Sequence, residues 1–416
     1  DIGTVMKATQ TLSGEIFLDQ LLKKVMRILI ENAGAQRGVL LLETDGQLQI
    51  EAEGAISGEP QVMQSIPLAG SNAVPEAIVQ YVQRTSENVV LGDAANEGRF
   101  IKSPYVMENQ PKSVLCSPIT KQGKLVGILY LENSLSTNAL TPERVEILSI
   151  LSAQTAISLE NARLVADETE RQKLQKEMEM AKDVQMSILP AEAEDDAYNI
   201  AAHMTPAEQV GGDYYDYYRV GDDRWVAIGD VTGHGLNSGL LMLMAQTGFS
   251  TYLNSTPKPD TVELFKAVNQ TLHNNMAERT KQNLYMTFTV LRADAFGNFE
   301  HAGKHEDILV WRKATGKVEV VQTDGVWMGI VPDVSGMIDK SVFKLNPGDF
   351  ITLFTDGVIE CRDKARQQFD TERLVKTIED NAAAGIDVVK DKIVKACFDF
   401  MDHQDDDVTL FIMQKK

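Results

Sequence analysis

The chain has 416 residues, of which 43% are hydrophobic, and this predicts two or three globular domains with sizeable cores. Its formal net charge of −20 argues against nucleic acid as a partner, because a phosphate backbone attracts a basic surface. No apolar run reaches the roughly 20 residues that a membrane span needs, so we expect no membrane segment. The three cysteines, Cys116, Cys361 and Cys397, are far apart and odd in number. They argue against a disulfide framework or a zinc site and favour a reducing, cytoplasmic compartment.

Residues 1–158 mix helix and strand signals. Apolar residues recur at helical spacing over 18–29, and Gly34 is the expected stop of that helix. Residues 38–42 are typical of a buried strand. We therefore expect sheet and helix in one domain.

Two later signals complete this region. Apolar segments 113–119 and 125–131 flank a Gln-Gly-Lys turn, which is typical of a hairpin. Thr141 followed by Pro142 predicts the start of a helix, with Thr141 as its cap.

Residues 159–190 predict a helical linker, because Gly and Pro are absent up to Ile188 and Glu, Lys, Arg, Gln, Ala and Met dominate. Apolar residues follow a 3–4 spacing, with polar interruptions at Asp167, Arg171 and Gln185. The seam consists of Ile157, Leu164, Leu174, Met178, Ala181 and Ile188. A seam this long predicts a coiled coil that joins two copies into a homodimer. The alternative is a single amphipathic helix lying on a domain.

Residues 191–416 predict an α+β domain with a large antiparallel component. Strands joined by short turns are interrupted by helical stretches near 237–253, 260–278 and 371–400. The acidic segment 191–196 follows Pro190 and is expected to be a polar joint.

One predicted hairpin carries the first candidate site residues. Asp213 precedes an aromatic strand, and the next strand ends on Asp230. Hairpin partners have residue numbers of roughly constant sum, so a turn centred near residue 222 pairs Asp213 with about position 230. Both carboxylates should lie at the open end of the hairpin, although a slip in register would change their facing.

Two further strands repeat this arrangement. The apolar strand 350–354 leads to Asp356, and the strand 408–413 follows the aspartates 405–407. If these strands are antiparallel neighbours, their aspartates meet at one end. Crowded carboxylates repel each other, and Mg²⁺ or Mn²⁺ would compensate because these ions prefer oxygen ligands. Two such ions, about 3.5–4 Å apart, can activate a water and hold a phosphoryl group.

A single aspartate at a strand end usually only caps a turn. We expect no more than that of Asp216, Asp222 and Asp223. His234 lies in the glycine-rich segment after Asp230. It is expected either to shuttle protons or bind phosphate, or to hold the turn.

At these residues the chain resembles the bacterial PPM-type serine/threonine phosphatases of the stage II sporulation and stress-regulator group. The shared motifs are GGDYYDYY, GDVTGHG, YMTFTVL, GDFITLFTDGVIE and DDVTL, in the family's order over about 190–416. The resemblance implies an αββα sandwich with two Mn²⁺ or Mg²⁺ ions. By motif, it implies that Asp213, Asp230, Asp356 and Asp406 are catalytic metal ligands, assisted by the Val231 carbonyl. It also implies a substrate, phosphoserine or phosphothreonine on an anti-anti-sigma (STAS) protein.

The chain departs from the family pattern at two places. Many members have Ala-Gly-His-Pro where this chain has Ala-Gly-Lys-His at 302–305. The helix after His234 starts with Asn-Ser-Gly at 237–239, where the family often has small apolar residues. Neither departure removes an implied ligand, but both can alter substrate choice or helix docking.

Residues 1–158 resemble a GAF domain through the hairpin 113–132 and the segment 91–94. This implies an antiparallel sheet with flanking helices, and either a small-molecule ligand or a role in dimerisation alone. Cys116 is expected in the core rather than as a chromophore attachment point. The segment 7–16 resembles GAF domains of very large multi-sensor kinases, and no initiator Met opens the chain. We therefore expect that an N-terminal kinase-like module is missing from this piece.

The leading hypothesis is a GAF-regulated phosphatase that acts on a signalling protein. One rival is a pseudophosphatase that binds phosphorylated partners without turnover, and the four aspartates argue against it. A second rival is a cyclic-dinucleotide synthase, suggested by the Gly-Gly-Asp at 211–213. That activity would need an acid at Tyr214, and the downstream motifs do not fit it.

Overall fold

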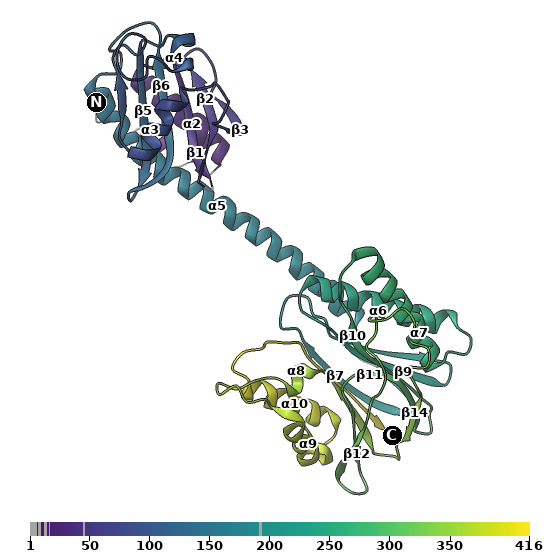
Figure 1. Ribbon diagram of the computed structural model, residues 1–416. Coiled ribbons are helices and arrows are strands. Elements are labelled where there is room, and N and C mark those ends of the chain that lie inside the picture. Colours follow the sequence, from purple (N-terminus) through teal and green to yellow (C-terminus); the bar gives the residue numbers. More distant parts are fainter. Residues whose placement is uncertain (1–5, 7–9, 12–14, 16, 45, 191–193) are drawn as a thin grey trace. The chain divides into compact units, whose positions relative to one another are not determined.

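The computed structural model describes residues 6, 10–11, 15, 17–44, 46–190 and 194–416. Most of the segment 7–16 and part of the acidic joint 191–196 lie outside these residues. The chain forms two compact units, Asp1–Lys173 and Leu174–Lys416 (Figure 1). Among the helices in the described part of the chain, none has the length and apolarity needed to cross a bilayer.

The first unit contains a six-stranded antiparallel sheet with the order β3-β2-β1-β6-β5-β4. Its strands are β1 (Arg37–Thr44), β2 (Gln47–Ala55), β3 (Gln61–Pro67), β4 (Val89–Leu91), β5 (Ser113–Lys121) and β6 (Lys124–Asn133). Its helices are α2 (Leu18–Ala33), α3 (Glu76–Thr85), α4 (Pro104–Asn109) and the first part of α5 (Pro142–Ile188). The predicted hairpin is β5–β6, and the predicted helix start at Pro142 is confirmed.

The sheet is apolar on both faces because its strands alternate between two cores. In β1, Leu40 packs with α2 and the start of α5, whereas Val39 and Leu41 pack with α3. This explains why 38–42 has the continuous apolar run typical of a buried strand. Helix α2 ends where predicted, at Gly34, whose φ of 64° lets its N–H reach the last carbonyls of the helix.

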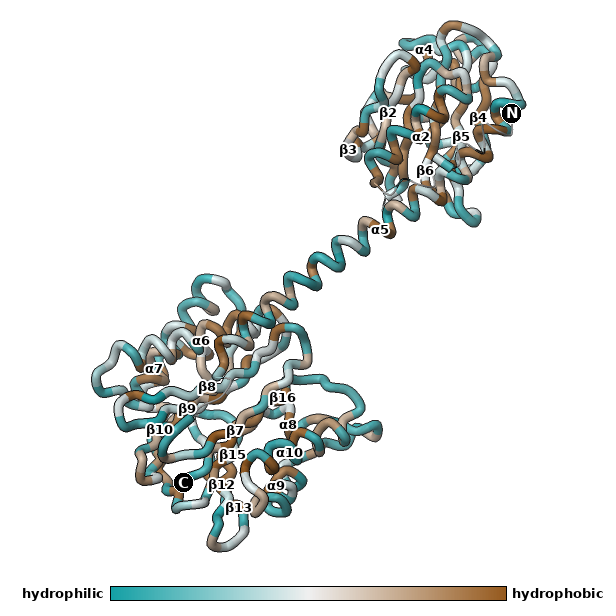
Figure 2. The backbone as a smooth tube through the Cα atoms, turned by 180° about the vertical axis from the view of Figure 1, so that it is seen from behind, coloured by the Kyte–Doolittle hydropathy of each residue, from teal (hydrophilic) through white to brown (hydrophobic). Residues whose placement is uncertain are grey.

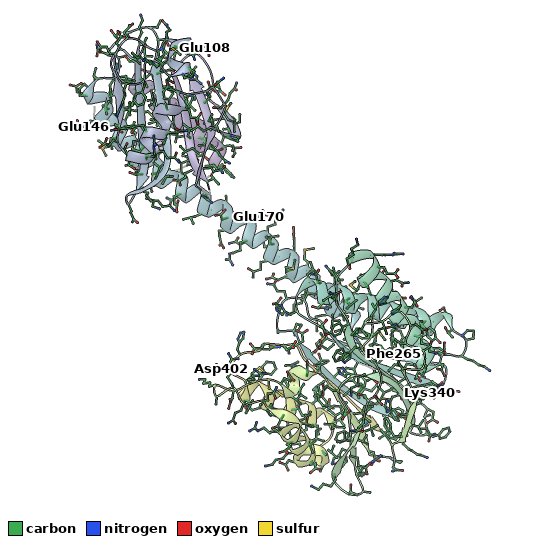
Figure 3. The ribbon with its side chains drawn as sticks, in the orientation of Figure 1. Glu108, Glu146, Glu170, Phe265, Lys340 and Asp402 are labelled. Carbon is green, nitrogen blue, oxygen red and sulfur yellow. The ribbon has the colours of Figure 1, made fainter. Side chains whose placement is uncertain are left out.

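Helix α5 is one continuous element of 47 residues. Its first part buries Leu148 and Leu151 in the core of the first unit. Its middle is mostly hydrophilic (Figure 2), and Glu170, labelled in Figure 3, is exposed there. The predicted helix over 159–188 is therefore confirmed, and it continues a helix that begins earlier, at Pro142.

The second unit contains two five-stranded antiparallel sheets. One has the order β14-β11-β10-β9-β8, and the other has the order β13-β12-β15-β16-β7. The first half of the unit contributes β7 (Tyr198–Thr205), β8 (Tyr214–Val220), β9 (Asp223–Val231), β10 (Met286–Ala293) and β11 (Asn298–Lys304). The second half contributes β12 (Ile308–Arg312), β13 (Lys317–Val321), β14 (Ser341–Lys344), β15 (Phe350–Phe354) and β16 (Val408–Lys415).

Helices cover the outer face of each sheet (Figure 1), which confirms the predicted αββα sandwich. Over the first sheet lie α6 (Leu236–Ser255), α7 (Thr261–His273) and a π-helical segment (Asn274–Thr280). Over the second lie α8 (Asp356–Ile359), α9 (Asp370–Asn381), a short 3-10 turn (Ala382–Ala384) and α10 (Ile386–Phe400). The helical stretch expected over 371–400 is thus divided into two helices, because Gly385 with its φ of 99° separates them.

Two cores hold these layers together. The larger core lies under α6 and α7 and between the sheets, and Phe265 of α7, labelled in Figure 3, belongs to it. The smaller core lies under α9 and α10. Strand β15 serves both, because Ile351 and Leu353 pack into the larger core while Phe350 and Phe354 pack into the smaller one. Asp356 begins α8 two residues after the end of this strand.

Candidate active site

The hairpin β8–β9 brings the first two predicted aspartates together. Tyr214 pairs with Gly229, so the register continues to Asp213 and Asp230 at the open end, as predicted. Asp213 is buried, with 1% of its surface exposed. The two carboxyl groups are close enough that hydrogen bonding with Asp213 lowers the pKa of Asp230, while the charge of Asp230 raises the pKa of Asp213. Such a contact between two acids requires either a shared proton or a cation that holds both oxygens.

The second sheet supplies the other aspartates. Strands β15 and β16 are antiparallel neighbours, with Phe354 opposite Leu410, as predicted. Asp356 begins α8 just after β15, and Asp406 lies just before β16. There is no room for a side chain at Gly357, because a Cβ there would collide with the Asp407 carbonyl. Helix α8 therefore lies directly against the aspartate segment before β16.

Hydrogen bonds join the two sheets at this point. Thr355 and Thr409 donate their hydroxyls to Oδ2 of Asp213, over 2.7 and 2.5 Å. Asp407 accepts the backbone N–H groups of Gly212, at 2.7 Å, and of Asp213, at 3.2 Å. Asp213 is thus held by side chains of the second sheet although it belongs to the first.

Asp407 is a positioning residue that the sequence reasoning did not single out. Its carboxylate is buried and bound to backbone N–H groups, whereas the neighbouring Asp406 is exposed. A run of three aspartates carries no signal that tells which one points inward, because that depends on the register of β16.

Burial and neighbouring charges raise the pKa of the carboxyl groups at this edge. Burial and then the charges of Asp356 and Asp406 raise the pKa of Asp230 to about 8. Burial and then Asp406 raise the pKa of Asp356 to about 6. Burial also raises the pKa of Asp213, and partial desolvation of the carboxyl group raises that of Asp406 although the residue as a whole is exposed. All four predicted aspartates therefore lie in one region where negative charge is poorly compensated.

One atom shows the lack of compensation directly. Oδ1 of Asp356 is buried and has no hydrogen-bond partner among the described residues. An ionised oxygen in that state is costly, and a cation ligand would remove the cost. The Val231 carbonyl also approaches this edge, since a Cβ on Gly212 would lie only 3.0 Å from its oxygen.

The donor set consists of oxygen atoms, which suits Mg²⁺ or Mn²⁺. In the described parts of the chain, no three acidic, histidine or cysteine side chains are already arranged around one metal position. Mg²⁺ commonly keeps several waters and takes only one or two carboxylates, so pairs of carboxylates with a carbonyl remain an adequate ligand set. The residues present thus fit such ions by their chemistry.

His305 is a second residue whose role the sequence did not reveal. One ring nitrogen lies 2.7 Å from the hydroxyl of Thr287, and the other lies 2.9 Å from the Phe354 carbonyl. The same hydroxyl lies 3.2 Å from the backbone N of Asp230. Burial lowers the pKa of His305 to about 4, so the ring is neutral. It links the strands that carry Asp230 and Asp356, and the only sequence signal was the unusual Lys-His in the 302–305 segment.

Gln185 connects the end of α5 to the site. It is buried, donates to the Gly211 carbonyl at 2.7 Å and accepts from the Gly211 N–H at 3.0 Å. From sequence it was only a polar interruption of the seam. In the structure it holds the loop that leads to Asp213.

Other candidates lie as follows. Asp216 does not cap a turn: it is buried in β8, accepts from the hydroxyl of Tyr214 at 2.9 Å, and has a pKa that burial raises to about 6. His234 is 74% exposed and lies 2.7 Å from Glu208. Cys116 is buried in the core of the first unit, as expected.

Comparison with known families agrees with this geometry. Residues 221–416 match the model of Stage II sporulation protein E (SpoIIE), and residues 17–159 match the GAF domain model. The chain combines a GAF domain with a SpoIIE-type PPM phosphatase domain. Within the SpoIIE-type domain the match begins after β8, so Asp213 precedes it, whereas Asp230, Asp356 and Asp406 lie inside it.

Relatives and solved structures extend this comparison. The chain is 26% identical over 262 residues to hybrid signal transduction histidine kinase G of Dictyostelium discoideum, covering 39% of this chain but 8% of the relative. It is 26% identical over 250 residues to phosphoserine phosphatase RsbU of Bacillus subtilis, covering 59% of this chain and 72% of the relative. The SiaA-PP2C domain of Pseudomonas aeruginosa has the same fold, with a TM-score of 0.52 at 18% identity over 60% of this chain and 98% of that domain.

Proposed function

We propose that the SpoIIE-type domain hydrolyses phosphoserine or phosphothreonine on a signalling protein, in particular a phosphorylated STAS-type protein. The observation that carries this proposal is the buried oxygen of Asp356, which has no partner among the described residues, beside the carboxyl groups of Asp213 and Asp230. Two carboxylate pairs that need cations, at the edge of an αββα sandwich, suit metal-assisted phosphate hydrolysis. The printed name of the RsbU relative, a phosphoserine phosphatase, supports the reaction class.

In this proposal two Mn²⁺ or Mg²⁺ ions are held by Asp213, Asp230, Asp356 and Asp406, with the Val231 carbonyl assisting. When bound, such ions activate a water and stabilise charge on the phosphoryl group. Other residues of the protein fix the positions of these ligands. Thr355 and Thr409 orient Asp213, Asp407 holds the loop before it, and His305 ties the strand of Asp230 to that of Asp356.

We further propose the organisation expected from sequence, with a sensor domain over 1–158, a linker over 159–190 and the phosphatase over 191–416. The GAF domain would regulate the phosphatase through α5, because Gln185 near the end of this helix binds both backbone groups of Gly211, two residues before Asp213. A small molecule bound to the GAF domain is one source of such a signal.

The linker is also proposed to form a homodimer in a cytoplasmic setting. Apolar side chains of α5 that a monomer leaves in water support this, notably Leu164, Leu174 and Val184, which are 57%, 51% and 56% exposed. A second α5 helix would cover them. Light scattering of the whole chain at tens of micromolar measures the oligomeric state directly.

The experiment that tests the proposed reaction compares hydrolysis with and without metal. We expect the protein to hydrolyse an aryl phosphate and a phosphorylated STAS-type protein in Mn²⁺ or Mg²⁺, and to lose both activities in excess chelator. Activity that persists in chelator would contradict the two-metal site. Binding of the phosphoprotein without release of phosphate in Mn²⁺ would instead favour the pseudophosphatase.

A further inference from the structure

Two of the three cysteines share one hydrogen-bond acceptor in the second unit. The thiol of Cys361 donates to the Val358 carbonyl at 3.5 Å, and the thiol of Cys397 donates to the same oxygen at 3.6 Å. Cys361 lies just after α8, and Cys397 lies in α10. Hydrogen bonding with Cys397 is the main cause that lowers the pKa of Cys361.

Only one of the two sulfurs can be reached from solvent. Cys397 is fully buried, whereas Cys361 is half-buried and lines a cavity of about 240 Å³. Arg362 and Asp406 line the same cavity. A small oxidant can therefore meet the Cys361 sulfur first, and the Cys397 sulfur is the only other thiol at the shared Val358 carbonyl among the described residues.

We propose that Cys361 and Cys397 are a peroxide-sensitive pair whose conversion to a disulfide lowers the activity of the neighbouring site. In the first step the Cys361 thiolate attacks hydrogen peroxide, the O–O bond breaks, and a sulfenic acid and hydroxide form. The hydroxide takes a proton and leaves as water. In the second step the Cys397 sulfur attacks the sulfenic sulfur and loses its proton, so the disulfide and a second water form. The peroxide is reduced, and both thiols are oxidised.

The link to the site is α8, which has only four residues. It begins at Asp356 and carries the Val358 carbonyl on which both thiols rest. The disulfide has no S–H group, so this carbonyl loses both donors, and the end of α8 becomes covalently tied to α10. Because Gly357 leaves no space between α8 and the Asp407 backbone, a shift of α8 moves Asp356 against Asp406. A misplacement on the order of 1 Å can cost about 10²-fold in rate.

The test treats the 416-residue chain with hydrogen peroxide in chelator, removes the peroxide with catalase, and then adds Mn²⁺. We expect thiol titration of the unfolded protein to fall from three free thiols to one, consistent with the three cysteines of the chain. Peptide mass mapping should show a cross-link between the peptides of Cys361 and Cys397. Hydrolysis of an aryl phosphate should fall by about tenfold or more and return after a dithiol reductant, given the cost of misplaced ligands.

Three variants serve as controls. Cys361→Ser and Cys397→Ser each keep a hydroxyl donor for the Val358 carbonyl, so they should be active and keep that activity after peroxide. Cys116→Ala removes a cysteine from the first unit and should behave as the wild type does, both before and after oxidation.

The effect on activity rests on the proposed phosphatase function, but the cross-link does not. If the reduced protein shows no hydrolysis in Mn²⁺ while the cross-link forms, the proposed function is wrong but the proposed peroxide-sensitive pair is supported. If no cross-link forms between Cys361 and Cys397, the proposed pair is wrong, whatever the activity. If peroxide lowers the activity of Cys361→Ser as much as that of the wild type, the disulfide does not cause the loss, and the proposed regulation is wrong.

Discussion

Both units gather ionisable side chains in their interior, and they compensate them in opposite ways. In the GAF domain, Arg37 binds Glu53 at 2.7 Å and Glu132 at 3.2 Å. It also donates to the hydroxyl of Tyr105 at 2.7 Å, and Tyr130 donates to Glu132 at 2.8 Å. Every charge in this cluster has an opposite charge or a hydrogen-bond donor within the protein.

The candidate site of the SpoIIE-type domain does the reverse. Burial and neighbouring carboxylates raise the pKa of its four predicted aspartates, and one buried oxygen of Asp356 has no partner among the described residues. A balanced cluster holds a fold together, whereas an unbalanced one costs stability until a cation from outside completes it. Clusters of ionisable side chains thus indicate structure in one unit and chemistry in the other.

The largest effect should come from removing a carboxylate of the unbalanced cluster. Asp230→Asn and Asp356→Asn should each lower the rate of aryl phosphate hydrolysis in Mn²⁺ by at least about 10²-fold, because lost ligands remove both water activation and charge stabilisation. The matched control is Asp222→Asn, an exposed position in the β8–β9 turn, which should keep full activity. Comparable losses of activity in all three variants would show that the loss does not depend on membership of the aspartate cluster.

Breaking the balanced cluster should instead cost stability. Arg37→Met leaves Glu132 with its carboxylate largely buried, which should cost roughly 3 kcal/mol in the first unit. The exposed pair of Arg27 with Glu59 is the control, and Arg27→Met should cost less than about 1 kcal/mol. Hydrogen exchange of β1 and β6 measures the local free energy of opening. If both variants exchange alike, the GAF cluster contributes no more than a surface ion pair.

The unbalanced cluster should also make the metal-free protein sensitive to pH. Folding raises the pKa of Asp230 to about 8 and that of Asp356 to about 6. The folded protein therefore binds more protons than the unfolded chain between about pH 4 and 8, so the stability of the chelated protein falls as pH rises through this range. Urea unfolding at pH 5.5 and 8 should show this loss in the second unit. The Asp230→Asn variant should lose less stability between these two pH values, and so should the wild type in Mn²⁺.

The smallest effect concerns the helix that joins the two units in sequence. Insertion of one to four residues after Glu170 rotates the later part of α5 by about 100° per residue, so activity should vary several-fold across the series. A seven-residue insertion restores the seam and should recover the wild-type rate. Light scattering measures whether these proteins, and a Leu174→Glu, Met178→Glu variant, form dimers. Equal activity throughout would mean that the linker transmits nothing.

Several features of the fold follow from local pattern. The hairpin β8–β9 could be predicted because a turn near residue 222 determines its register, and the register brings Asp213 to Asp230. The end of α2 at Gly34 could be predicted because a left-handed cap favours glycine. The division between α9 and α10 was missed, because the brief 3-10 turn between them hardly interrupts the helical pattern.

The sequence by itself determined that the aspartates of both sheets lie at strand ends and that α5 is helical, because each of these features depends on spacing over a few residues. Only the tertiary structure decided which polar side chains serve those aspartates. Gln185, His305 and Asp407 act across 26, 49 and 195 residues of chain, on Gly211, Phe354 and Gly212. The pairing of Cys361 with Cys397 likewise depends on how α10 packs beside α8. Such contacts have no local signal, because they follow from the packing of whole layers around two cores.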